Sequence, residues 1–283
     1  MINAVVNAAG TWMWNNRTHG ELKWATIETE HFNIHYHQNL DKIALQGASI
    51  AEQIRSTLMK QMGLESLPTL DIIFTAEDEV LNGFAVPANY TIIWVDQNDA
   101  ALWTGDEKWL RTVLAHELQH LVYFNTVKGP WWLPEPMNSL VHGTPAWIVE
   151  GIAEYFTEEW RPFRYELSHR YHVLRNTVHK IQDPHNDGYS KSLYLADRFG
   201  DSTISKILNH RNKFKFLDFK ESFKKHTGIT LKQFNEDWRR QMNTFYFSQR
   251  SQKERLEDAG TIRKLPIKRF LSFDYFSDTS RVA

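Results

Sequence analysis

The chain has 283 residues, of which 42% are hydrophobic and 24% charged, a composition typical of a globular protein and not of a disordered one. Lys and Arg number 33 against 34 Asp and Glu, so no overall positive charge favours nucleic acid as a partner. The absence of Cys excludes disulfides, Cys-ligated metals and thiol catalysis. A metal site in this chain must use His and carboxylate side chains.

The two ends of the chain differ from its middle. Residues 1–23 are expected to form an N-terminal extension. The first ten of them lack the basic region and the long apolar run of a signal peptide. Residues 253–283 combine a basic stretch with a later run of strand composition, which predicts a linker and the start of a strand-rich domain. No apolar stretch reaches the roughly 20 residues that cross a bilayer, so no transmembrane segment is predicted.

Strand and helix patterns alternate in residues 24–106, which we expect to form an α/β lobe. Residues 31–38 alternate between apolar and polar side chains, as in a strand with one solvated face. Helical spacing of apolar residues follows from Asp41, the expected N-cap, to Met62, before Gly63. Runs rich in β-branched and aromatic residues predict further strands at 69–75 and 91–95.

Helical patterns dominate residues 107–252, which we expect to form a helical lobe. The predicted helices are 107–126, 146–159, 162–181, 189–199, 202–213, 218–227 and 230–250. A small mixed sheet followed by a mostly helical lobe corresponds to an α+β fold class.

The strongest chemical signal is the HExxH pattern formed by His116, Glu117 and His120 inside the first of these helices. Two histidines four residues apart project from one helix face, so that both imidazoles can bind one metal ion. Glu117 lies beside them, where it can act on a metal-bound water. Apolar residues surround the three, and a metal would supply the partner that buried polar groups need.

A third ligand is needed, because catalytic zinc sites use three protein ligands. Tyr123 and Thr126 stand where a metzincin would have Gly and His, so we expect the ligand to be Glu150 on the helix at 146–159. Gly151 and Ala153 would let that helix approach the first one closely. Glu154, one turn beyond Glu150, would then accept a hydrogen bond from the outer ring nitrogen of a ligating histidine.

The HExxH pattern followed by the run Trp147-Ile-Val-Glu-Gly-Ile-Ala-Glu-Tyr resembles the gluzincin metallopeptidases, and most closely the bacterial peptidase MA-like domains. The resemblance implies a thermolysin-like fold, with an edge strand over the HExxH helix. It extends to residues 82–87, which resemble the turn into that edge strand. Gly83, Phe84 and Ala85 would then pair with the backbone of a substrate.

This resemblance implies that His116, His120 and Glu150 bind one Zn²⁺ per chain and that Glu117 is the general base of peptide hydrolysis. Gluzincins also place a Tyr or His opposite the zinc to stabilise the oxyanion. Tyr189, in a run that we expect to start a helix, is the first candidate for that role. The competing candidates are His142, His179 and His185.

Two departures from the family pattern affect the prediction. The region around residues 82–87 lacks the glutamate motif with which aminopeptidases hold a free N-terminus, which favours an endopeptidase acting on peptides or proteins. The interval between His120 and Glu150 is also longer than usual and contains the aromatic segment 129–136. That segment could wall the cleft or pack on a neighbour.

A second reading of the chain remains open at this stage. Similar chains continue into a β-propeller, so the domain could be a catalytically silent scaffold for a C-terminal propeller. The intact Glu117 favours the enzyme, because a scaffold has no need of a general base. The resemblance also leans towards an extracytoplasmic, periplasmic or secreted location.

Overall fold

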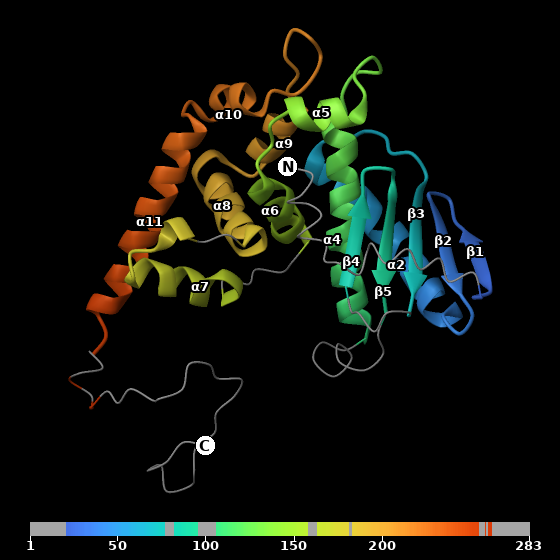
Figure 1. The fold of residues 1–283 in the computed structure, drawn as a ribbon, viewed down its shortest axis with the longest axis horizontal. Coiled ribbons are helices and arrows are strands. Elements are labelled where there is room, and N and C mark those ends of the chain that lie inside the picture. Colours follow the sequence, from blue (N-terminus) through green and yellow to red (C-terminus); the bar gives the residue numbers. More distant parts are fainter. Residues whose placement is uncertain are drawn as a thin grey trace, which may run out of the picture.

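The computed structural model describes residues 21–76, 82–95, 106–157, 163–180 and 183–254, together with 258, 260 and 261. Within these ranges the protein is a mixed α+β structure, with a five-stranded sheet on one side and mostly helices on the other (Figure 1). The coarse α+β fold class predicted from the sequence is confirmed. The predicted division into four segments remains a prediction, and most of its two end segments lies outside the described residues.

The sheet is mixed, and β4 lies at one of its edges. Its strands are β1 (Trp24–Glu28), β2 (Phe32–His37), β3 (Leu70–Thr75), β4 (Asn82–Val86) and β5 (Tyr90–Trp94). They lie in the order β1-β2-β3-β5-β4, where β2, β3 and β5 are parallel and the two outer strands are antiparallel to their neighbours. Among the described strands, β4 therefore pairs with β5 alone.

Helices make up the rest of the described structure. They are α2 (Asp41–Met62), α4 (Asp106–Val127), α5 (Glu135–Val141), α6 (Ala146–Thr157), α7 (Phe163–Leu174), the 3₁₀ turn η3 (Val178–Lys180), α8 (Pro184–Phe199), α9 (Ser202–Asn209), α10 (Phe219–Thr227) and α11 (Leu231–Ser251). The described residues contain no helix that is both long and apolar enough to span a bilayer.

Helix α4 connects the sheet to the helical part of the molecule. It packs on β4 and β5, on α2 beside it, and on α6, and Figure 1 shows it running along the sheet between the two parts. Its core side chains, Leu110, Leu114, Leu118 and Leu121, are almost fully buried. They belong to one apolar core that includes residues of both the sheet and the later helices, so α4 is held on both sides.

Most element boundaries follow the sequence patterns, but α7 ends at Leu174 instead of 181 and α9 ends at Asn209 instead of 213. Four further differences concern other elements. Gly63 ends α2 in the left-handed conformation as expected, but the N-cap position is Leu40 and Asp41 begins the first turn. The strand β1 and the short helix α5 were not predicted. Helix α8 begins at Pro184, before the expected residue 189, because Asp183 accepts hydrogen bonds from its first-turn amides.

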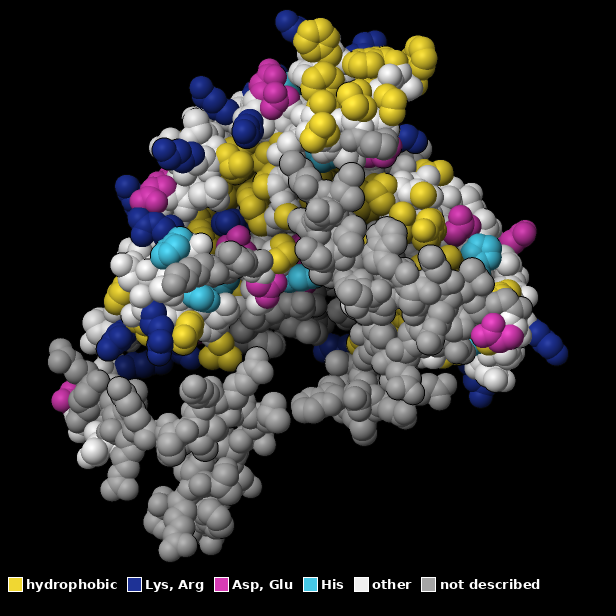
Figure 2. Space-filling model, in the orientation of Figure 1, with side chains coloured by type: hydrophobic (Ala, Val, Ile, Leu, Met, Phe, Trp, Pro, Cys, Tyr) yellow, Lys and Arg dark blue, Asp and Glu magenta, His cyan; other side chains and the backbone are white. Residues whose placement is uncertain are grey.

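Helix α5 and its neighbouring loops project from one end of the molecule (Figure 1). The space-filling view shows hydrophobic side chains gathered on this end (Figure 2). Trp131 is 97% exposed, so this indole ring does not line a closed cleft wall.

The fold buries one histidine whose protonation we expect to destabilise it. His169 of α7 is 0% exposed, its Nδ1 lies 2.9 Å from the carbonyl oxygen of Tyr165, and its Nε2 has no hydrogen-bond partner among the described residues. Burial lowers its pKa to about 4. The unfolded chain therefore binds the proton more readily, and the stabilising effect of a neutral His169, complete above pH 6.5, is lost as the pH falls towards 4.

We expect this residue to remove about 2 kcal/mol from the free energy of unfolding between pH 7 and pH 5. His169→Asn keeps a side-chain N–H near the Tyr165 carbonyl and removes the titrating group, so the variant should lose less stability over this interval. Urea unfolding of both proteins at pH 7, 6 and 5 measures the difference. Equal pH dependence in the two proteins would show that His169 is not the responsible group.

Candidate metal centre

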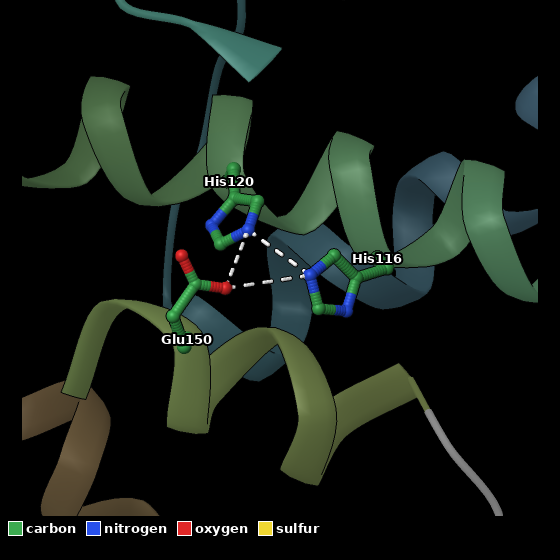
Figure 3. Close-up of side chains that lie close together, drawn as sticks. All are labelled: His116, His120 and Glu150. Atoms are coloured by element: carbon green, nitrogen blue, oxygen red, sulfur yellow. Dashed lines mark hydrogen bonds and ion pairs between the residues drawn. The ribbon is translucent and has the colours of Figure 1, made fainter. Parts of the chain in front are cut away.

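Helix α4 presents the two histidines of the HExxH pattern on one face, towards α6. The Nε2 atoms of His116 and His120 lie 3.1 Å apart, because residues one helical turn apart project in the same direction. Glu150 of α6 points between them, and its Oε2 lies 3.6 Å from His116 Nε2 and 3.3 Å from His120 Nε2 (Figure 3). Three potential ligand atoms thus converge from two helices.

These separations match what a zinc ion requires. Ligand atoms bound at about 2.0–2.1 Å in a tetrahedral arrangement lie about 3.3 Å from one another, and the three observed distances span 3.1 to 3.6 Å. Two imidazoles and one carboxylate also form a ligand set that zinc sites use in hydrolytic enzymes. The residues present therefore fit a zinc ion without rearrangement.

The charges at the centre favour an ionised Glu150. Burial raises the pKa of this carboxyl, but the histidines beside it have the larger combined effect and hold the pKa well below its usual range. For His120, burial lowers the pKa while Glu150 and Glu117 raise it, with a net upward shift. The raised pKa of His120 and the lowered pKa of Glu150 both reflect the attraction between an imidazolium and a carboxylate. A bound metal cation would take the place of the His120 proton as the positive charge beside Glu150.

Glu117 lies beside this centre and directly beneath strand β4. Its side chain is buried, at 5% exposure, and burial raises its pKa. A methyl group added to Gly83 of β4 would collide with the Glu117 side chain, at 2.7 Å from Oε1 and closer still to Cγ. Only a glycine lets the edge strand approach the carboxylate this closely.

This contact makes Gly83→Ala a test of the placement of Glu117. The new methyl group must displace either the carboxylate or the strand, and misplacement by about 1 Å can lower a catalysed rate about 100-fold. For the peptide hydrolysis that the sequence predicts, we expect a loss of this order with unchanged metal content, because the candidate ligands lie on α4 and α6, which do not carry the substitution. Gly260→Ala, whose methyl group meets nothing within 4 Å, is the control. Unchanged hydrolysis by Gly83→Ala would contradict the prediction.

His185 of α8 is a further member of the cluster. Its Nδ1 lies 2.9 Å from Glu154 Oε1 and 3.4 Å from Glu150 Oε2, and its ring stacks on that of His116. Burial lowers its pKa, but the hydrogen bond to Glu154 and the charge of Glu150 raise it by more. The sequence offered His185 only as one competitor among several, since it has no motif spacing to the HExxH pair.

Glu154 is fully buried and lies between two histidines. Its Oε1 is hydrogen-bonded to His185 at 2.9 Å and lies 4.0 Å from His116 Nδ1, a separation longer than a hydrogen bond. The expected role, as acceptor for a ligating histidine, therefore remains a prediction. The carboxylate does lie on the expected side of His116.

The other candidates for an oxyanion partner lie in different surroundings. Tyr189, one turn after His185, is 2% exposed, and its ring packs on Tyr165 with centroids 5.6 Å apart. His142 ends α5, where its Nδ1 interacts with Thr144. His179 lies in η3 and lines a separate groove between α8, α10 and α11.

Gly151 has a different neighbour from the one we expected. The sequence suggested that it brings α6 close to the HExxH helix, but a methyl group at Gly151 would collide with the backbone of Gly188 in α8. Gly188 in turn faces Gly151 and the carbonyl oxygen of Trp147. The two glycines therefore let α6 and α8 touch backbone to backbone, which brings His185 next to Glu150 and Glu154.

Comparison with known proteins finds likenesses among solved structures. No family model matches the chain, and no curated protein matches it. Among solved structures, the chain is similar to an aminopeptidase N family protein from Idiomarina loihiensis, at 13% sequence identity and a TM-score of 0.44. The alignment covers 77% of this chain and 46% of that one, so the chain spans less than half of that protein.

Proposed function

We propose that the protein is a zinc-dependent peptidase of the gluzincin type with a thermolysin-like fold, in which His116, His120 and Glu150 hold one Zn²⁺. The observation that carries the proposal is the convergence of their three ligand atoms at separations of 3.1 to 3.6 Å. The buried carboxylate of Glu117 lies beside them on α4, the helix of the two histidines. A structural ion pair would need neither Glu117 nor a glycine above it.

Glu117 would act as the general base and then the general acid of peptide hydrolysis, next to a bound Zn²⁺. A bound Zn²⁺ supplies a Lewis acid that polarises a carbonyl group and lowers the pKa of a water molecule. Glu117 takes a proton from the attacking water and returns it to the nitrogen of the leaving amine, so that water is added across the broken C–N bond. Burial, which raises the pKa of this carboxylate, makes it a stronger base for the first transfer.

The position of β4 supports a peptide as substrate. Gly83, Phe84 and Ala85 belong to β4, which lies at the edge of the described sheet and next to Glu117, and the outer side of such a strand can pair with the backbone of an extended peptide. Binding by backbone pairing does not require the substrate to present a free N-terminus or C-terminus. It therefore favours internal cleavage, that is, an endopeptidase.

His185 and Tyr189 are both proposed as candidates to stabilise the oxyanion, and the geometry favours His185. Its side chain is 44% exposed and adjoins Glu150, whereas Tyr189 is packed against Tyr165. If His185 has this role, His185→Gln should lower kcat more than KM. Tyr189→Phe should then leave kcat nearly unchanged.

Metal analysis together with casein hydrolysis tests the proposed function. We expect about one zinc per chain, cleavage that is lost after treatment with a chelator, and recovery on addition of Zn²⁺. Zinc binding without cleavage of casein or of a random peptide library would favour a silent scaffold. Absence of zinc from the folded protein at micromolar metal would overturn the proposal.

A further inference from the structure

A patch of apolar side chains covers the end of the molecule where α5 projects. We name this patch the apolar tip and define it as Trp131, Trp132, Met137, Leu140, Val141 and Phe214, all of which are exposed large hydrophobics. The first five lie in the interval between His120 and Glu150, and Phe214 lies in the loop after α9. Figure 2 shows this end of the molecule covered by hydrophobic side chains.

The apolar tip is held in place by the buried side of the same segment. Asn138 is fully buried, and its side-chain amide donates a hydrogen bond of 3.1 Å to the carbonyl oxygen of Val127, the last residue of α4. The amide of Phe219 donates to the carbonyl oxygen of His142 at 2.9 Å, which joins the loop of Phe214 to the end of α5. The exposed side chains therefore stand on a fixed base.

The composition of the apolar tip resembles that of a membrane-interface surface. Trp131 is 97% exposed, and tryptophan is favoured at the boundary between lipid headgroups and acyl chains. Three exposed lysines, Lys128, Lys213 and Lys215, accompany it, and Lys213 Nζ lies 5.0 Å from the Phe214 ring centroid. Lysines beside projecting apolar side chains complement the negative charge of anionic lipid headgroups.

The size of the apolar tip also favours a membrane over a second copy of the chain. Taking about 150–250 Å² for a whole aromatic side chain, the six residues expose on the order of 600 Å², at the upper limit of the largest apolar patch of an ordinary monomer. A stable protein interface needs about 800 Å² per partner. A projecting patch below that size is suited to shallow insertion into a bilayer.

We propose that the apolar tip docks the protein onto the surface of an anionic phospholipid bilayer, with Trp131, Leu140 and Phe214 inserted and the lysines on headgroup phosphates. His120 lies seven residues before Val127, about 10 Å along α4. Docking would therefore hold the candidate metal centre close to the membrane surface. The proposal does not depend on peptidase activity.

Flotation with vesicles tests this proposal on the full chain. We expect binding to vesicles of phosphatidylcholine with phosphatidylglycerol (3:1), and at least tenfold weaker binding by Leu140→Ser/Phe214→Ser. The matched control is Leu167→Ser/Phe245→Ser on α7 and α11, which removes side chains of similar exposure (69% and 49%, against 61% and 56%) elsewhere on the surface. Trp131→Ser is a second variant. Because Trp131 is 97% exposed, this variant should fold normally and bind the vesicles less tightly than the wild-type protein.

Two further measurements separate the membrane from other partners. Lys128→Gln/Lys213→Gln should weaken binding to the anionic vesicles and leave any binding to pure phosphatidylcholine vesicles unchanged. Failure of the wild-type protein to bind anionic vesicles would overturn the proposal, as would equal binding by Leu140→Ser/Phe214→Ser. Sedimentation without lipid that shows a dimer, lost in the same double variant, would instead assign the apolar tip to contact between copies of the chain.

Discussion

Glu117→Gln is expected to lower the rate of peptide hydrolysis by about 10³-fold, within the range that a general base contributes, while zinc content stays at the wild-type level. The amide keeps the size of the carboxylate and fits beneath Gly83, but it cannot accept the proton of the attacking water. Metal analysis and casein hydrolysis on the same samples measure both effects. Glu221→Gln, at an exposed position on α10, is the matched control.

The same substitution has an expected effect on stability. Burial raises the pKa of Glu117, which means that the folded protein disfavours the ionised form of this carboxyl group. A neutral isostere removes that cost, so the apo form of Glu117→Gln should unfold at the same or a higher temperature than the wild-type apo protein. A variant that keeps its stability but loses its activity has lost a group that serves function and not folding. Hydrolysis at the wild-type rate would show that Glu117 is not the base.

His120→Ala is expected to produce the largest loss of metal affinity. Removal of one of the three proposed ligands should weaken zinc binding by more than about 100-fold, beyond the 10–100-fold that groups outside the ligand set contribute. Glu150→Ala should have a similar effect, since Glu150 Oε2 lies within 3.6 Å of both imidazole nitrogens. Competition with a chromogenic chelator gives the affinities.

The loss in His120→Ala should be independent of folding. The control is His179→Ala, which removes an exposed histidine of η3 and should keep wild-type affinity. Circular dichroism of each apo variant checks that the helices are retained. Wild-type zinc affinity in His120→Ala would place the metal elsewhere, and the proposed function would then lose its basis.

Local patterns in the sequence were sufficient for the parts of the centre that lie on one helix. The four-residue spacing of His116 and His120 determines that both rings leave α4 on the same face, whatever the rest of the chain does. The predicted limits of α2 and α4 differ from the observed ones by at most one residue at either end. Periodicity over 22 residues is a strong signal because each turn repeats it.

Shorter elements were harder to predict. The strand β1 has five residues and is mostly exposed, so its sequence carries little alternation, and its pairing with β2 is what makes it a strand. Helix α5 has seven residues and begins within the proline-rich stretch 130–136, a composition that predicts a loop. Its form depends on Asn138, whose side chain binds the end of α4.

The sequence by itself determined which side chains are available as ligands: no thiol, two histidines on α4 with Glu117 between them, and Glu150 on α6. Only the tertiary structure decided that Gly83 contacts the Glu117 side chain and that Gly151 faces α8. The same is true of the position of His185 beside Glu150 and Glu154 and of the exposure of Trp131. The first group depends on spacing within one helix, which local backbone geometry sets. The second depends on how closely separate elements approach, and that is set by side-chain size and burial across the whole core.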